Sequence, residues 1–374
     1  MRPIKDYISQ RSASVDASGI RKVFDLAAKM ADPINLSIGL PDYDVPPAAK
    51  QAAIDAIASG NNRYTQTQGI APLREALRKQ LSAEIGRDCG EVLITSGVSG
   101  ALFLAILATI NPGDEAVFLD PYFVMYKHLL TVAGGRSVPV NSYPDFRFPA
   151  DRVEAAITPR TKLLILNSPA NPTGFVMSES DVRAAVEIAR KHDLLLISDE
   201  IYEAFLYDAP AGSGLPTPAK LYDRTVILRG FSKSHAMTGW RLGYAAGPAE
   251  VIAEMTKLQQ YTYVCAPSPL QYAALAVVDS PMTEAVAAYR RKRDIAYEVL
   301  SRKFEVVRPG GAFYIFPKVP DGITATEFCT RAIENNVLVI PGNVFSERDT
   351  HFRISYATTD ERLRQGCEIL CGLV

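Results

Sequence analysis

Short apolar runs that alternate with amphipathic stretches limit the fold of this chain most strongly. Runs of strand length occupy residues 92–95, 116–119, 163–166, 194–198 and 225–228, and segments with apolar residues at helical spacing lie between several of them. Strands alternating with helices favour a mostly parallel sheet covered by helices on both faces. We therefore predict an α/β protein with a large domain at 41–280 and a smaller α/β domain built from 1–40 and 281–374.

Bulk composition excludes several classes of partner. The chain has 374 residues and a net charge of -1, so neither nucleic acid nor an anionic membrane is an expected partner. The longest apolar run, 101–110, is too short to span a bilayer, and the N-terminus lacks the apolar core of a signal peptide. Five scattered cysteines show neither zinc-ligand spacing nor a disulfide framework, which predicts no metal site and a cytoplasmic protein.

Helical periodicity predicts further elements outside the five apolar runs. Helices are expected at 19–30, 47–59, 72–85, 101–108, 178–191, 249–260, 282–303 and 325–335. In the helix at 282–303, the basic residues from Arg290 to Arg293 are expected to form a solvated face. Further strands are expected at 244–247, 313–316, 337–340 and 351–356.

The most specific chemical signal is Ser232-Lys233-Ser234 followed by Gly239-Trp240-Arg241-Leu242-Gly243. A lysine that lies near other cations and away from water loses its proton readily and becomes a nucleophile. An arginine fork matches the geometry of a phosphate better than a lysine ammonium does. An isolated Ser-Lys-Ser is usually a surface feature, but the whole stretch is much rarer.

A second signal is an anion-binding turn. The strand at 92–95 runs into Ser96-Gly97-Val98-Ser99-Gly100, where a helix begins. Free backbone N–H groups and the positive end of a helix dipole at such a turn attract phosphate. Neither a dinucleotide fingerprint nor a Gly-x4-Gly-Lys-Ser/Thr phosphate loop is present in the sequence.

Three further polar residues lie on or after apolar strands. Asp199 follows the strand at 194–198, where α/β sheets place ligand contacts, although a helix N-cap is an alternative for it. Asn171 lies in the proline-rich turn 167–174. Arg353 alternates with apolar neighbours and could hold a carboxylate as a fork, the alternative being a surface salt bridge.

Five motifs stand in order along the chain: Gly-x-Pro-Asp at 39–42, Asn-Pro-Thr-Gly at 171–174, Asp-x-x-Tyr at 199–202, Ser-Lys…Gly-Trp-Arg-x-Gly at 232–243 and Phe-Arg-Ile-Ser at 352–355. Together they resemble the class I/II aminotransferases, which are fold-type I pyridoxal 5'-phosphate (PLP) enzymes, and especially the aspartate and aromatic aminotransferases. The resemblance covers nearly the whole chain. It implies a homodimer and the fold-type I architecture, with a mostly parallel sheet between helices in the large domain.

The resemblance also implies residue roles at one end of the cofactor. Lys233 would form a Schiff base with the PLP aldehyde, and Arg241 would hold the phosphate. Further phosphate contacts would come from Val98, Ser99, Ser232 and, across a dimer interface, Tyr64 of the partner chain. The family usually carries serine or asparagine near the positions of Arg229 and Gly230, so this chain departs from the pattern there.

At the other end, Asp199 would keep the pyridine nitrogen protonated, and Tyr202 and Asn171 would donate to the ring oxygen. Phe123 would stack on the ring, although a place in the core is an alternative for it. Arg353 would bind the α-carboxylate of the amino acid. Gly39 would lie against the substrate, with a plain turn as its alternative. In the family, Lys233 also moves the Cα proton as a general base.

The resemblance implies an aminotransferase that moves the amino group of an L-amino acid to a 2-oxo acid. A carbon–sulfur β-lyase or an ACC-synthase-like, cyclopropane-forming enzyme shares the same cofactor residues and remains an alternative. A PLP-sensing transcription regulator is not expected, because residues 1–40 show no basic helix-turn-helix pattern. Tyr122, Phe123, Tyr261 and Tyr263 hint at aromatic or apolar substrates, although core packing explains them equally well.

Overall fold

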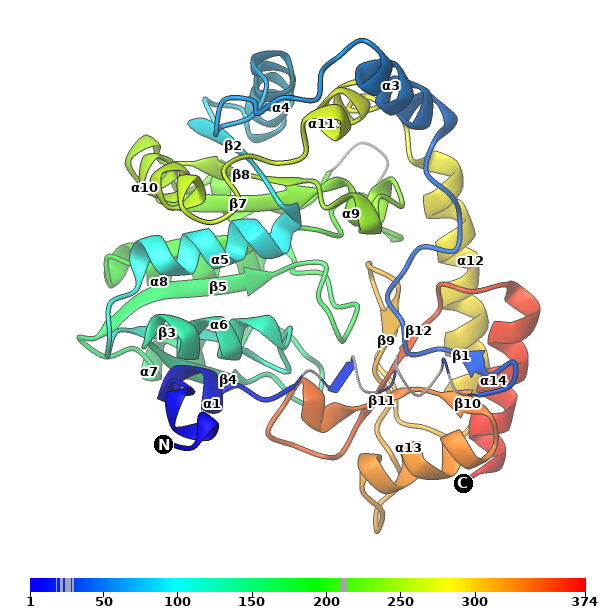
Figure 1. The fold of residues 1–374 in the computed structure, drawn as a ribbon. Coiled ribbons are helices and arrows are strands. Elements are labelled where there is room, and N and C mark those ends of the chain that lie inside the picture. Colours follow the sequence, from blue (N-terminus) through cyan, green and yellow to red (C-terminus); the bar gives the residue numbers. More distant parts are fainter. Residues whose placement is uncertain (18, 21–22, 24–27, 29, 209–213) are drawn as a thin grey trace.

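The larger part of the chain is organised around a seven-stranded sheet, seen in a computed structural model that describes residues 1–17, 19–20, 23, 28, 30–208 and 214–374 (Figure 1). The strands lie in the order β2 (Glu91–Thr95), β8 (Gly243–Gly247), β7 (Thr225–Gly230), β6 (Leu195–Asp199), β5 (Thr161–Asn167), β3 (Glu115–Asp120) and β4 (Arg136–Asn141). Only β8 is antiparallel to its neighbours, so the prediction of a mostly parallel sheet is confirmed.

Helices cover both faces of this sheet because its strands are apolar on both sides. One face packs against α5 (Gly97–Thr109), α6 (Met125–Ala133) and α10 (Ala249–Gln260). The other face packs against α4 (Ala71–Ile85), α7 (Ala150–Ala155), α8 (Glu179–Lys191) and α11 (Ser268–Leu275), and α3 (Pro47–Ala58) packs on α11. The α8 helix begins at a capping box in which Ser178 and Asp181 satisfy each other's backbone N–H groups.

Alternation along the central strands decides which side chains reach which face. Ile197 on β6 and Leu228 on β7 pack against the α5 face, whereas Leu196 and Ile227 pack against the opposite face. Asp199 continues the first series and Arg229 the second, since successive side chains of a strand point to opposite faces. The two residues therefore end neighbouring strands with their side chains on different sides of the sheet.

Two small sheets form the second part of the structure. β1 (Ile34–Asn35) pairs in parallel with β10 (Val337–Leu338), and β12 (Phe352–Ser355) lies antiparallel between β11 (Ile340–Pro341) and β9 (Tyr314–Ile315). The helices α12 (Thr283–Leu300), α13 (Ala325–Glu334) and α14 (Asp360–Gly372) surround them in Figure 1. Segments far apart in sequence thus meet, because a strand at 34 pairs with one at 337.

The remaining short elements are η1 (Ile4–Tyr7), α1 (Gln10–Ala13), η2 (Pro218–Lys220), α9 (Phe231–Ser234), η3 (Thr238–Trp240) and η4 (Gly342–Val344). In Figure 1, α1 lies beside α6 of the large sheet. Most of the helix expected at 19–30 lies outside the described residues. The division into domains at 41 and 281 stays a prediction. No helix in the described ranges has the length and apolar character needed to cross a membrane.

The expectation of a solvated face from Arg290 to Arg293 is wrong for two of its residues. Lys292 and Arg293 are buried, because α12 packs on both parts of the structure. Arg293 pairs with Asp208 and donates to the backbone carbonyl of Pro309 at 2.7 Å. Lys292 pairs with Asp42, on the segment that leads from β1 into the large sheet. Buried arginine and lysine charges thus join α12 to the rest of the chain.

Candidate active site

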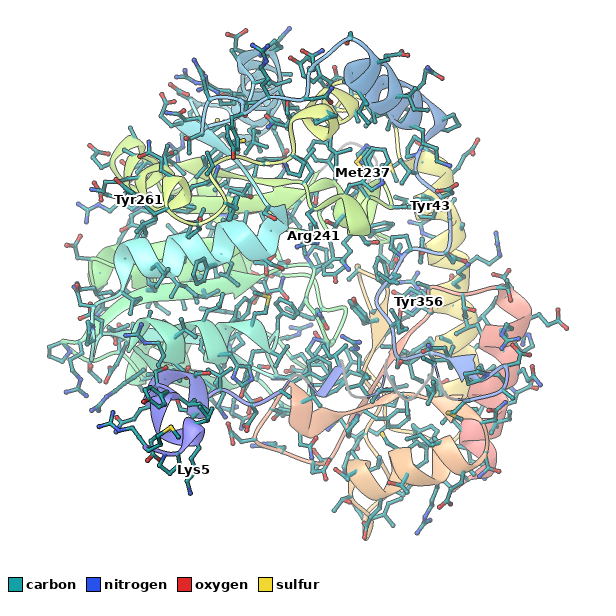
Figure 2. All side chains as sticks on the ribbon, viewed as in Figure 1. Lys5, Tyr43, Met237, Arg241, Tyr261 and Tyr356 are labelled. Atoms are coloured by element: carbon teal, nitrogen blue, oxygen red, sulfur yellow. The ribbon has the colours of Figure 1, made fainter. Side chains whose placement is uncertain are left out.

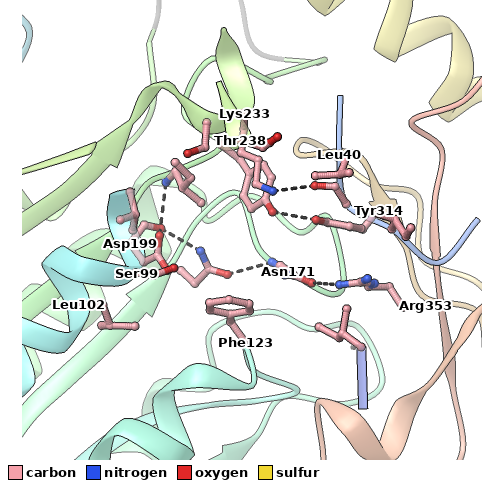
Figure 3. A pocket seen from close by; sticks show the side chains of 18 of the residues that line it. Leu40, Ser99, Leu102, Phe123, Asn171, Asp199, Lys233, Thr238, Tyr314 and Arg353 are labelled. Atoms are coloured by element: carbon pink, nitrogen blue, oxygen red, sulfur yellow. Dashed lines mark hydrogen bonds between the residues drawn. The ribbon is translucent and has the colours of Figure 1, made fainter. Parts of the chain in front are cut away.

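A cavity of about 340 Å³ lies at the carboxyl ends of β5, β6 and β7, where the two parts of the structure meet. Its size is within the usual range of small-molecule sites, about 300–1,000 Å³. The predicted site residues that line it are Gly39, Val98, Ser99, Phe123, Asn171, Asp199, Tyr202, Ser232, Lys233, Arg241 and Arg353. Figure 3 labels six of them around one space, namely Ser99, Phe123, Asn171, Asp199, Lys233 and Arg353. The exception is Tyr64, which lies on the surface with an exposed fraction of 82%.

Lys233 enters the cavity from α9, directly after β7. Its Nζ donates to the backbone carbonyl of Gly39 at 2.7 Å. The backbone of the same turn is held by Tyr43, whose hydroxyl donates to the carbonyl of Ser234 at 2.7 Å. Burial, with smaller contributions from the cations Arg353 and Arg241, lowers the pKa of Lys233 to about 8. At pH 7 about one molecule in ten then carries a neutral amine, against fewer than about one in a thousand for an ordinary lysine.

Asp199 lies on the opposite wall at the end of β6 and is only 2% exposed. Its carboxylate accepts hydrogen bonds from the Tyr126 hydroxyl of α6 at 2.7 Å and from the Ile201 backbone N–H at 3.4 Å. Burial raises the pKa of Asp199 to about 6 despite these bonds. Among the described residues no lysine or arginine forms an ion pair with it, so a buried carboxylate faces the cavity without a cation. No helix begins at Asp199, which removes the N-cap alternative.

Arg353 is the third charged group of the cavity and is 1% exposed. It donates to the Asn171 side-chain oxygen at 3.0 Å and to the Ser37 carbonyl at 2.6 Å, and its Nε has no partner. Within the described part of the chain no carboxylate pairs with it, so the alternative of a surface salt bridge is wrong. Burial lowers the pKa of Arg353. The guanidinium lies over the Tyr314 ring, 4.5 Å from the centroid, and keeps part of its donor capacity for a ligand.

The start of α5 and Arg241 lie together at one end of the cavity. The N-cap Ser96 makes no side-chain cap, so N–H groups of the first turn remain available. A Cβ added to Gly97 would come within 2.7 Å of Arg241 Nη2, which places the guanidinium against this turn. A Cβ on Gly243 would meet the Val98 nitrogen at 2.7 Å, so only glycine allows β8 to approach so closely. Figure 2 shows Arg241 at this end of α5.

Sequence reasoning missed several residues that shape the site. Tyr126 binds Asp199, Tyr314 shares a 2.8 Å hydrogen bond with Tyr202, and Asn167 accepts from the Asn171 N–H at 2.9 Å. Alternation along the strand at 313–316 could have indicated that Tyr314 leaves the apolar face. Phe123 lines the cavity and also packs against Tyr126, so its position is compatible with both interpretations, and its stacking on a cofactor ring stays a prediction.

Three of the four aromatic residues that hinted at the substrate do not line the cavity. Tyr261 is 85% exposed beside α10 (Figure 2). The Tyr263 hydroxyl accepts from the Ser96 N–H at 3.3 Å, and the Tyr122 hydroxyl lies 3.4 Å from Glu347. Only Phe123 remains as an aromatic contact from that set.

Comparison with known proteins agrees with the geometry over the whole chain. Residues 31–370 match the family model described as aminotransferase class I and II. The aspartate aminotransferase of Pyrococcus abyssi is 37% identical over 96% of both chains. The aspartate/prephenate aminotransferase of Thermus thermophilus is 38% identical over 98% of both chains. A solved structure of the Thermus thermophilus aspartate aminotransferase with maleate has a TM-score of 0.94, at 35% identity and full coverage of both chains.

These relatives are aminotransferases, so the lyase and synthase alternatives are not favoured. The similarity extends across both parts of the structure and includes the cavity between them. The chain therefore belongs to the class I and II aminotransferases and is a PLP-dependent transaminase with the fold-type I architecture.

Proposed function

We propose that Lys233, Asp199 and Arg353 carry out amino transfer from an L-amino acid to a 2-oxo acid in this cavity. One observation carries the proposal: an amine with a lowered pKa shares the cavity with a buried carboxylate and a buried guanidinium, and neither charge has an ionic partner among the described residues. Isolated buried charges are costly, so a ligand of matching charges is the natural partner of such a cavity.

The residues present fit PLP. Its phosphate matches the α5 N-terminus and Arg241, with Ser232 close by, and its protonated ring nitrogen matches the carboxylate of Asp199. Lys233 would hold the aldehyde, Phe123 would lie against the ring, and Asn171 and Tyr202 would donate to the ring oxygen. When bound, PLP supplies a carbonyl that carries the amino group and a ring that accepts electrons. Asp199 then keeps the ring cationic.

Side chains of the cavity bind the substrate, move a proton and limit the access of water. Arg353 binds the α-carboxylate and orients the amino acid, with Gly39 close to the substrate. A Cβ at Gly39 would overlap the Tyr314 hydroxyl, so only glycine leaves this space open. Lys233 Nζ takes the proton from the substrate Cα as general base, which its lowered pKa permits near neutral pH. The apolar walls at Ile38, Leu102 and Ile201 limit the access of water.

The lowered pKa of Lys233 has a measurable consequence. Because the neutral amine is the nucleophile, the rate at which cofactor-free enzyme captures PLP should rise about tenfold for each pH unit up to about pH 8 and then level off. Stopped-flow absorbance would measure this rate. In Arg353→Met one of the cations that lower the pKa is lost, so the midpoint of the rise should move to higher pH. A midpoint near the pKa of an ordinary lysine, about 10.4, would contradict the claim that the cavity lowers the pKa of Lys233.

Arg353→Met should affect substrate more than cofactor. Losing two charge-assisted hydrogen bonds to the α-carboxylate should lower kcat/KM for the amino acid by about 10²–10⁴-fold, since each contributes about 1.5–3 kcal/mol. PLP affinity should change less than about threefold. A simple monocarboxylic acid used as a competitive inhibitor should lose affinity by a comparable factor. An unchanged inhibition constant would show that the carboxylate binds elsewhere.

The experiment that tests the function incubates the PLP-loaded protein with a panel of amino-acid donors and two 2-oxo acid acceptors. The relatives described above are named as aspartate and aspartate/prephenate aminotransferases, so aspartate and prephenate enter the panel first. We expect stoichiometric exchange, with one new amino acid formed for each 2-oxo acid released. Pyruvate and ammonia released without an acceptor would instead indicate a lyase.

Two further properties belong to the proposal. The chain acts as a homodimer in which Tyr64 reaches the phosphate of the partner's cofactor; its exposure, on the loop between α3 and α4, supports this. Light scattering should return about twice the mass of one chain. The cytoplasm is the proposed compartment, supported by five cysteines that form no disulfide. Fractionation of the source cells would test it.

A further inference from the structure

Arg229 lies near a position where the family usually has a serine or asparagine. Its side chain does not point into the candidate active-site cavity. It is the fifth residue of β7, and its side chain is 5% exposed on the face of the sheet that packs against α4. Contact with the phosphate therefore does not explain why an arginine is buried four residues before Lys233.

The guanidinium of Arg229 is shared between two carboxylates. Its Nη1 and Nη2 donate to Glu84 of α4 at 2.7 and 2.8 Å, as a fork. Its Nε donates to Glu200 at 2.8 Å. The other oxygen of Glu200 accepts from Ser198 at 2.7 Å and from Thr217 at 2.5 Å. Both oxygens of Glu200 are thus bonded, which fixes the rotamer of a fully buried side chain.

Glu200 directly follows Asp199, and the two side chains point to opposite faces of the sheet. Asp199 faces the cavity and Tyr126, whereas Glu200 faces Arg229. The backbone between them is also held in the sheet, because the Glu200 N–H donates to the Leu228 carbonyl at 2.9 Å. Holding Glu200 therefore holds the peptide that presents the Asp199 carboxylate.

We propose that Arg229 is a positioning residue for Asp199, which it fixes through Glu200 and shields from the charge of Glu200. The proposal rests on the proposed contact of Asp199 with the cofactor ring. Arg229 touches neither substrate nor cofactor, so it acts only through the Asp199–Glu200 peptide.

The charges around Asp199 and Glu200 support a positioning role for Arg229. Burial is the main cause of the raised pKa of Asp199, and the nearby charge of Glu200 raises it further. Arg229 forms an ion pair with Glu200 at 2.7 Å, which sets a compensating cation beside that charge. Glu203, which follows in the same turn, has a pKa raised to about 8 by burial and is mostly neutral at pH 7. The other ionisable groups facing the cluster are Glu84 and Tyr244. Asp199 itself is faced by Tyr126, which donates to it, and by Tyr202 and Lys233 in the cavity. Without Arg229, the buried carboxylate of Glu200 and the partly buried carboxylate of Glu84 would lack their shared cation.

The test uses pyridoxine 5'-phosphate, which lacks the aldehyde, so capture by Lys233 does not enter the measurement. Its dissociation constant is followed against pH by fluorescence, and the thermal midpoint of each cofactor-free variant is recorded. In the wild type, affinity should fall as the pH falls and Asp199 gains a proton. In Arg229→Met, this acid limb should move up by about one pH unit, so affinity on the limb, at about pH 5, should fall about tenfold, while affinity at pH 7 should fall about twofold.

Three variants separate positioning from general stability. Glu84→Gln breaks the fork but leaves Glu200 compensated, so it should lower the thermal midpoint without moving the acid limb upward. Arg229→Met/Glu200→Gln removes the uncompensated charge and should return the limb to within about 0.3 pH unit of wild type. Arg229→Lys keeps the charge and should rescue most of the shift. If Arg229→Met does not fold, the double variant and Arg229→Lys still decide, because each must keep the wild-type limb.

The proposal would be overturned if the acid limbs of Arg229→Met and Glu84→Gln coincided. It would also be overturned if the acid limb of Arg229→Met/Glu200→Gln stayed shifted. A wild type that binds neither pyridoxine 5'-phosphate nor PLP would instead refute the proposed function. The two failures are therefore distinguishable.

Discussion

Replacing Lys233 by alanine should abolish amino transfer while leaving the protein folded. Lys233 is the only residue proposed both to hold the cofactor and to move the Cα proton. The loss should therefore exceed the range for a general base alone, about 10²–10⁴-fold in kcat. The fold should survive because, among the residues that the structure describes, the side chain makes only one hydrogen bond, to the Gly39 carbonyl. Single-turnover kinetics with one amino acid would measure the rate.

Lys233→Arg is the matched variant, because it keeps a cation of similar length without a usable neutral amine. It should be as inactive as Lys233→Ala, and both should still bind pyridoxine 5'-phosphate through the phosphate turn and Asp199. An added primary amine should restore part of the activity of Lys233→Ala, because it replaces the missing base. Near-native activity in either variant would contradict the role of Lys233.

The second large effect is expected for Asp199→Asn, which keeps the shape of the side chain but removes its charge. Losing one partner of a buried, hydrogen-bonded charge pair costs about 2–5 kcal/mol, so kcat/KM should fall by about 30- to 5,000-fold. PLP should also bind more weakly, since the ring nitrogen loses its counter-charge. Steady-state kinetics and equilibrium dialysis would measure both quantities.

Tyr126→Phe is the control for Asp199→Asn. It removes the hydroxyl that donates to Asp199 at 2.7 Å and leaves the carboxylate in place. Because a hydrogen bond to a charged group contributes about 1.5–3 kcal/mol, its loss should stay within about 10- to 150-fold. An Asp199→Asn enzyme that remains as active as Tyr126→Phe would show that the charge of Asp199 is not required.

Much of the site was predictable because several of its key residues lie at or just after the ends of strands, and local sequence identifies strand ends. Asp199 and Lys233 follow apolar runs, and parallel order brings their carboxyl ends to one edge. Arg353 was predictable from its alternation with Phe352 and Ile354. Helix bounds could also be predicted from local sequence, since α10 begins and ends at the predicted residues.

The parts that were missed depend on contacts between distant segments. Tyr126 and Tyr314 resemble core aromatics in sequence, and only tertiary packing brings their hydroxyls to Asp199 and Tyr202. Arg293 was misread because its partner Asp208 is 85 residues away. The edge strand β4 carries Pro139 and partly exposed positions, so it lacks the apolar run that marks the central strands.

The strand expected at 337–340 is divided between two sheets. β10 pairs with β1, and β11 pairs with β12, so the chain changes partners after Leu338. Such a change leaves the local apolar pattern untouched, because all four residues are buried in either sheet. Pairing partners, unlike strand propensity, are set by the whole fold.

The most direct test of the account is to load the protein with PLP, reduce it with borohydride and map the labelled peptide by mass spectrometry. We predict one pyridoxyl group for each chain, on the ε-nitrogen of Lys233. A label on another lysine, or a chain that retains no label at all, would contradict the proposal that this amine holds the cofactor.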